Sequence, residues 1–417
     1  MSHIKSLIFT RIQAFMPLII MGLRGTTLVV KFLLTLFIAR FMGFSDVGVY
    51  GLIASLAIIV PIFSGLGITY ILTRRAVTQT PEEITEALFY YGRFISCVYL
   101  LLLAVAIIGG VLLNQLFFVL IILSILFLMH VNGDLYMLFL NLSRPFVANL
   151  LHFIFNAVWM SVFMVLAYLN PAFRTMEVLL ISWVIGGGLA LLGCVWLMKD
   201  WPWSSAKELG SLKDWVLEEF SEAKTMYFTG LTTTTAQYFN HFLILFLLGL
   251  ELTGVYVFFM QVVGALSNLL RTGVIQVTRP HLVRAYKEND AMYIPLYKKC
   301  LKHTGLSALA LALFSCPAMY VVILYLDRPL ALEWFSVLLL LLVVFVLTMV
   351  IEVNRLIFYA QHRDDIILKL GIIGVIGTIL LNVVLVPWLA LWGAAVVPLA
   401  MCGVAIVLQS KEIKRLI

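Results

Sequence analysis

Twelve apolar stretches of 21 to 27 residues follow one another along the chain, separated by more polar segments. Each is long enough to cross a bilayer as a helix, because an α-helix rises about 1.5 Å per residue. Apolar residues make up 63% of the chain and charged residues only 12%, a balance outside the range of soluble domains. We therefore predict an all-α polytopic membrane protein with twelve transmembrane helices. The predicted spans are residues 15–39, 48–73, 88–113, 116–140, 146–169, 177–198, 224–248, 254–278, 304–326, 333–359, 366–386 and 389–409.

Positive charge is distributed unevenly between the two sides of this predicted bundle. Of the 28 Lys and Arg residues, 22 fall on the side that holds both termini, three on the opposite side and three inside spans. Cytoplasmic loops of membrane proteins carry such an excess of Lys and Arg. We therefore predict that both termini are cytoplasmic. The same bias accounts for the net charge of +7 without any nucleic-acid partner.

An internal repeat divides the chain into two halves. Residues 41–50 read FMGFSDVGVY, and 206 residues later, residues 247–256 read LLGLELTGVY. More loosely, Val131-Asn132 resembles Val353-Asn354. Because glycine permits tight turns and close helix approach, we expect the repeated glycines to serve both purposes. The repeat predicts two six-helix lobes in parallel orientation, residues 1–198 and 224–417, a plan found in alternating-access transporters.

The segment between the lobes, residues 199–223, is predicted to be a cytoplasmic linker. Its sequence from Ser211, SLKDWVLEEFSEAK, has the pattern of an amphipathic helix. Such a helix can lie along the membrane surface as a hinge. The alternative is a simple lead-in to the seventh span.

Three cations lie inside predicted spans: Arg24, Lys31 and Arg271. A charge at the centre of a bilayer costs about 2.5–3.5 kcal/mol on the insertion scale, so each needs a polar partner. Arginine suits a phosphate because its guanidinium can form two parallel hydrogen bonds. We interpret the three as binding residues for an anion in a water-filled cavity. The alternatives are an ion pair with another helix for Arg24, and snorkelling to the nearer interface for Lys31 and Arg271.

Two carboxylates also lie inside spans. Asp134 follows His130 by one helical turn, and Glu352 precedes Arg355 by three residues. Carboxylate and histidine groups inside a membrane often form proton relays, so these four residues are candidates for ion coupling, with a proton or Na⁺ as the coupling ion. Structural pairing is the alternative for Asp134, and a local ion pair with Arg355 is the alternative for Glu352. Tyr90-Tyr91, near a span end, is predicted to belong to an interfacial aromatic belt.

The five cysteines are scattered and have no C-x-x-C spacing, which argues against a disulfide framework, a zinc site or an iron–sulfur cluster. We predict no metal and no organic cofactor.

Residues 40–76 resemble the first external loop and second span of bacterial polysaccharide-export proteins. The matching residues are Arg40, Gly43, Gly48, Tyr50, Gly65, Gly67, Arg74 and Arg75. The stretch VTRPHLVRAYKENDAMYIPLYKKCLKH, residues 277–303, resembles the same family's link between spans eight and nine. By this resemblance the chain is identified as a Wzx-type lipid-linked oligosaccharide flippase of the MOP superfamily.

The resemblance implies a V-shaped bundle with a cationic cavity, in the bacterial inner membrane. It implies that an undecaprenyl-pyrophosphate-linked oligosaccharide is moved from the cytoplasmic to the periplasmic leaflet, in the synthesis of O-antigen or another surface polysaccharide. With such a substrate, Arg24, Lys31 and Arg271 are expected to bind the pyrophosphate. A polysaccharide polymerase and a chain-length regulator are expected partners, and the protein itself is expected to be a monomer.

Three other functions fit parts of the pattern. A MATE-type cation-coupled drug exporter has the same layout, but a cationic drug calls for acidic rather than basic cavity residues. A membrane glycosyltransferase or polymerase needs a large external loop, and the predicted external loops are short. A non-transporting scaffold for an assembly complex leaves the buried cations unexplained.

Overall fold

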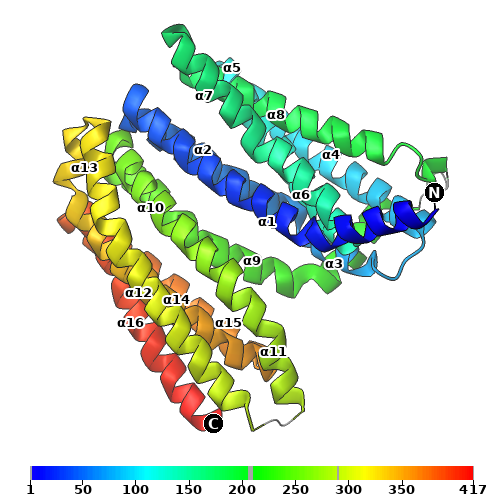
Figure 1. Ribbon diagram of the computed structural model, residues 1–417. Coiled ribbons are helices and arrows are strands. Elements are labelled where there is room, and N and C mark those ends of the chain that lie inside the picture. The colour runs from blue at the N-terminus through cyan, green and yellow to red at the C-terminus, as the bar shows by residue number, and fades with distance from the viewer. Residues whose placement is uncertain (1, 205–209, 289–290, 417) are drawn as a thin grey trace. The chain divides into compact units, whose positions relative to one another are not determined.

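The computed structural model describes residues 2–204, 210–288 and 291–416, and these are mostly helical and contain no β-strand (Figure 1). The α-helices are α1 (Ser2–Phe41), α2 (Phe44–Gly65), α3 (Ile68–Arg75), α4 (Pro81–Leu112), α5 (Leu116–Asn141), α6 (Pro145–Phe153), α7 (Trp159–Leu169), α8 (Met176–Leu197), α9 (Leu212–Leu248), α10 (Leu250–Leu270), α11 (Gln276–Lys287), α12 (Tyr293–Leu326), α13 (Pro329–Glu333), α14 (Phe335–Ala360), α15 (Asp364–Leu389) and α16 (Leu391–Leu416). Single π-helical turns at Ile154–Val158 and Arg271–Ile275 join α6 to α7 and α10 to α11.

Within the described residues, eleven helices or joined helix pairs are long and apolar enough to cross a membrane. They cover every predicted span except the seventh, so the chain is a multi-pass membrane protein. The seventh predicted span, 224–248, lies in α9, but only Gln237–Leu248 forms an apolar segment there. The threonines and other polar residues of 225–235 lower the hydropathy of the first half of this span.

The chain forms two compact units. Unit 1 comprises Met1–Leu34 and Ile53–Leu231, and unit 2 comprises Thr35–Leu52 and Thr232–Ile417. The unit limits fall inside α1, α2 and α9, so each of these helices contributes residues to both units. The lobes predicted from the repeat, 1–198 and 224–417, follow sequence symmetry and remain a prediction.

The repeated glycines of the two halves meet within unit 2. A methyl group added to Gly48 would overlap the carbonyl oxygen of Leu250, and one added to Gly254 would overlap the carbonyl oxygen of Phe44. Each of these contacts is the other shifted by 206 residues, so α2 and α10 cross with local two-fold symmetry. Glycine is required here because only a residue without Cβ lets the backbones approach this closely.

The preceding glycines form the turns. Gly43 and Gly249 occupy equivalent positions in the repeat and have φ angles of 121° and 86°. Residues with a Cβ rarely adopt such angles. The two purposes predicted for the glycines, tight turns and close helix approach, are thus confirmed.

Each half interrupts its second helix at the same place. In unit 1, α2 ends at Gly65, and Gly67 has a left-handed φ of 71° before α3 begins. The predicted second span, 48–73, is therefore too long as a single helix. In unit 2, the equivalent residues fall in the π-helical turn that begins at Arg271. π-Helical turns are rare and are frequent at functional sites.

The first turns of α9 pack against α3 and α4 of unit 1. Trp215 stacks on Tyr90 with a centroid distance of 5.2 Å, and Arg75 binds Glu219 at 2.6 Å and Glu222 at 2.7 Å. Burial raises the pKa of the Glu219 carboxyl, although its bond to Arg75 acts in the opposite direction. The amphipathic segment that begins at Ser211 is therefore the start of a continuous helix, α9, as the lead-in alternative expected.

Candidate functional site

Arg24 lies in α1 and is held by two neutral side chains of unit 1. Its Nε donates to Asn149 Oδ1 at 2.8 Å, and its Nη2 donates to the Tyr136 hydroxyl at 2.9 Å. Asn149 is itself fixed, since its Nδ2 donates to the carbonyl oxygen of Pro145 at 2.7 Å. Among the described residues, no carboxylate forms an ion pair with Arg24. The guanidinium is therefore oriented by neutral groups.

A second cation and a histidine belong to the same region of unit 1. Lys31 is half-buried two turns further along α1. The His152 ring packs against Tyr136 at a centroid distance of 4.9 Å, and both Arg24 and Lys31 act on it electrostatically. Arg24, Lys31 and the polar rings beside them thus form a basic polar cluster, which we call the Arg24 cluster.

Arg271 has a different environment in unit 2. Its Nη2 lies 3.4 Å from Glu352 Oε1, and the same oxygen lies 3.8 Å from Arg355 Nη1. Glu352 thus has two arginine partners, where the sequence suggested only the local one. The three residues carry one net positive charge. The Arg271 Nε is buried and has no hydrogen-bond acceptor among the described residues.

Asp134 and His130 are brought together around the hydroxyl of Tyr91 in unit 1. The Tyr91 hydroxyl donates to Asp134 Oδ2 at 2.7 Å and lies 3.0 Å from His130 Nε2. His130 Nε2 is 3.3 Å from Asp134 Oδ2. Thr69 Oγ1 donates to the Tyr91 hydroxyl at 2.7 Å. We call Tyr91, His130 and Asp134 the Tyr91 centre.

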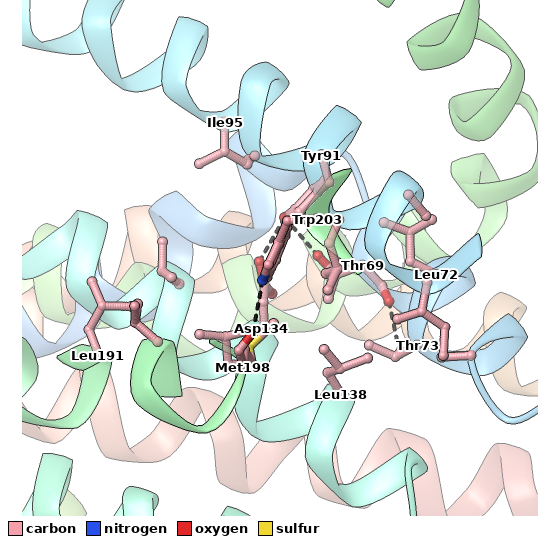
Figure 2. A pocket seen from close by; sticks show the side chains of 18 of the residues that line it. Thr69, Leu72, Thr73, Tyr91, Ile95, Asp134, Leu138, Leu191, Met198 and Trp203 are labelled. Atoms are coloured by element: carbon pink, nitrogen blue, oxygen red, sulfur yellow. Dashed lines mark hydrogen bonds between the residues drawn. The ribbon is translucent and has the colours of Figure 1, made fainter. Parts of the chain in front are cut away.

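The Tyr91 centre borders a cavity of about 470 Å³ inside unit 1. Figure 2 shows Tyr91, Thr69 and Asp134 joined by hydrogen bonds at its wall, among side chains that are mainly apolar. The wall comes from α3, α4, α5, α8 and the segment after α8. The absence of a side chain at Gly65 leaves room for the centre, because a methyl group there would lie 3.0 Å from His130 Nε2 and 3.2 Å from the Tyr91 hydroxyl.

Sequence reasoning missed three residues of these sites. Tyr91 was predicted to lie in an interfacial belt, but only 7% of it is exposed. Its position near a span end misled the prediction, since α4 begins at Pro81 and carries Tyr91 well inside the helix. Tyr136 and Asn149 gave no signal, because single polar residues in apolar helices are common and their partner Arg24 is more than 100 residues away.

The fold is similar to that of solved membrane transporters. The lipid II flippase MurJ in an inward closed conformation matches 95% of this chain and 87% of its own length, with a TM-score of 0.75 and 12% sequence identity. A multidrug resistance MATE family transporter of the MOP superfamily, in an inward-facing conformation, matches 94% of this chain and 95% of its own length, with a TM-score of 0.70 and 14% identity. At these identities the similarity establishes the fold alone.

Among curated proteins, none matches the sequence. A family model described as polysaccharide biosynthesis protein matches residues 37–328, well over half of the chain. The match includes the repeated turns, the Tyr91 centre and Arg271. The chain therefore belongs to the polysaccharide biosynthesis protein family.

Proposed function

We propose that the protein is a transporter that moves undecaprenyl-pyrophosphate-linked oligosaccharides from the cytoplasmic to the periplasmic leaflet of the bacterial inner membrane by ion-coupled alternating access. Its family, its similarity in fold to a lipid II flippase and the uneven distribution of Lys and Arg support this proposal. The oligosaccharide would serve the synthesis of a surface polysaccharide. Both termini would be cytoplasmic.

The observation that carries the proposal is the state of Arg24. Its guanidinium lies in a membrane-spanning helix and is oriented by Asn149 and Tyr136. If Arg24 served only to staple the helices together, a carboxylate would be its natural partner. A neutral cage leaves the charge available for an anion. A pyrophosphate supplies several acceptor oxygens that match the planar donors of arginine.

Lys31 adds a second positive charge on the same helix. It would interact with the pyrophosphate as a point charge rather than in a bidentate geometry. In unit 2, Arg271 is a weaker candidate because the carboxylate of Glu352 already partly neutralises its positive charge. We therefore assign Arg24 the main role, Lys31 a supporting role and Arg271 the smallest role in binding the pyrophosphate.

The test is transfer of a fluorescent polyprenyl-pyrophosphate oligosaccharide between leaflets of proteoliposomes that contain the purified protein. Arg24→Gln should lower the initial rate about 10- to 100-fold, because a hydrogen bond to a charged group contributes about 1.5–3 kcal/mol. Arg24→Lys should retain part of the rate. Arg284→Gln serves as the control, since Arg284 is exposed and bonded only to its helix neighbour Glu288 among described residues. A full rate in Arg24→Gln would refute the assigned role.

A further inference from the structure

The hydroxyl of Tyr91 lies between the two titratable groups of the Tyr91 centre. It is 2.7 Å from Asp134 Oδ2 and 3.0 Å from His130 Nε2, and these two atoms are 3.3 Å from each other. The two distances to the hydroxyl lie within the range of direct hydrogen bonds, and the third is slightly longer. The protonation of His130 and Asp134 then depends on how many hydrogen-bond donors the surrounding hydroxyl groups provide.

On the far side of the histidine, His130 Nδ1 lies 3.2 Å from Ser64 Oγ and 3.3 Å from the Tyr99 hydroxyl. Each of these hydroxyls has one hydrogen. Ser64 donates its hydrogen to the carbonyl oxygen of Val60 at 2.7 Å, and Tyr99 donates to that of Leu126 at 3.1 Å. Neither hydrogen remains for the ring. His130 Nδ1 therefore carries a hydrogen and donates it.

On the near side, the Tyr91 hydroxyl also has one hydrogen, which it donates to Asp134. Thr69 donates to the Tyr91 oxygen and so fixes the direction of the hydroxyl. His130 Nε2 and Asp134 Oδ2 would then face each other as two acceptors unless one of them carries a proton. The arrangement thus calls for one further proton on the His130–Asp134 pair.

We propose that Tyr91, His130 and Asp134 bind one exchangeable proton, and that Tyr91 is the positioning residue that decides which partner holds it. With the proton bound, the pair is neutral overall: either an imidazolium beside a carboxylate or a neutral ring beside a carboxylic acid. Release of the proton to water leaves one negative charge. Because the Tyr91 hydroxyl donates to the carboxylate, it favours the form in which His130 carries the proton.

The described side chains that contact the pair are uncharged, so the charge of the pair depends on whether its proton is bound. Among the described residues, α2 and α3 present only hydroxyl groups to it, from Ser64 and Thr69, and α4 presents Tyr91 and Tyr99. On the other face of α5, Tyr136 contacts Arg24 and His152. Beyond α8, Lys199 is exposed and lines the same cavity as Asp134. The cavity therefore offers a route between the pair and water.

This inference deepens the proposed function by assigning its coupling site, and it rests on that function only for the link to transport. The test is ¹⁵N NMR of histidine-labelled protein in detergent at neutral pH, without substrate. Loss of one signal in His130→Gln assigns His130. In Tyr91→Phe, the ratio of imidazolium to neutral His130 should fall about tenfold, since the carboxylate loses a donor. In Tyr91→Phe, an infrared band of a protonated carboxyl should also appear. The double variant Tyr91→Phe/Asp134→Asn should lack this band.

Tyr297→Phe is the matched control, because Tyr297 occupies the equivalent position of the repeat in unit 2 and should leave the His130 signal unchanged. If Tyr91→Phe does not fold, Thr69→Val, which frees the Tyr91 hydroxyl to rotate, should shift the ratio in the same direction by a smaller factor. An unchanged His130 signal in the folded variants overturns the proposal. That result would leave the proposed lipid transport untested by this experiment. Conversely, a failed transport assay would not contradict the proton site.

Discussion

In unit 1 the third and fourth spans are joined by Tyr91, whose hydroxyl donates to Asp134 at 2.7 Å. In unit 2, Tyr297 lies 206 residues later, and its hydroxyl donates to Asn354 Oδ1 at 2.8 Å. The fourth and sixth spans are also joined alike. Asn132 donates to the carbonyl oxygen of Gly187 at 3.1 Å, and Asn354, 222 residues later, donates to Gln409 Oε1 at 3.0 Å.

The two units differ in charge at one equivalent place. In unit 1, His130 packs against Gly65, which has no side chain. In unit 2, Glu352 stands at the position of His130 and Arg271 at the position of Gly65, and the two form an ion pair. A guanidinium does not lose its proton at physiological pH, whereas an imidazole does. If the Tyr91 centre binds a proton as proposed, the duplicated scaffold holds a permanent ion pair in one copy and a titratable pair in the other.

The largest expected effect concerns a feature that the halves share. Gly254→Ala should lower the free energy of unfolding by about 3 kcal/mol, because its methyl group would overlap the backbone of Phe44, which cannot move aside cheaply. Thermal unfolding in detergent measures the change. Gly264→Ala in the same helix is the control: no atom lies within 4 Å of its new methyl group, so stability should hold or rise. Equal stability of the two variants would contradict the symmetric crossing of α2 and α10.

A smaller loss is expected when the permanent pair is broken. Glu352→Gln leaves Arg271 and Arg355 facing each other without their shared carboxylate. Both arginine side chains are about two-fifths exposed, at 43% and 39%, so the cost should be about 1–2 kcal/mol rather than that of a fully buried pair. Thermal unfolding again measures it. If the variant is as stable as the wild type, the Arg271–Glu352 contact does not hold unit 2 together.

The sequence predicted the features that depend on length, hydropathy and local spacing. The helical spans and the glycine turns belong to this class. The approach of His130 to Asp134 was also predictable, because residues four apart share a helix face. The break at Gly67 was harder to foresee, since the apolar run continues through it.

Partners from distant spans could not be predicted. Arg24 lies more than 100 residues from Asn149 and Tyr136, and Arg271 lies 81 residues from Glu352. Hydropathy places such residues in the membrane but does not say which helices are neighbours. The repeat supplies part of that information, because a contact in one half predicts a contact in the other. Tyr91 and Tyr297 correspond across the 206-residue shift, and each hydroxyl donates to a polar side chain of the next span.

The smallest effect on stability, and the sharpest test of the difference between the units, is expected for Asp134→Asn. Asparagine keeps the shape of the side chain and can still accept the Tyr91 hydrogen, so the free energy of unfolding should change by less than about 1 kcal/mol. It cannot be protonated, so the pair can no longer gain a carboxyl proton. Transport into proteoliposomes should then lose its dependence on an imposed pH gradient, while Glu352→Gln should retain that dependence whatever its rate. If Asp134→Asn responds to the gradient as the wild type does, Asp134 is a structural partner of Tyr91, and the titratable pair of unit 1 differs from the ion pair of unit 2 only in the way it holds its helices.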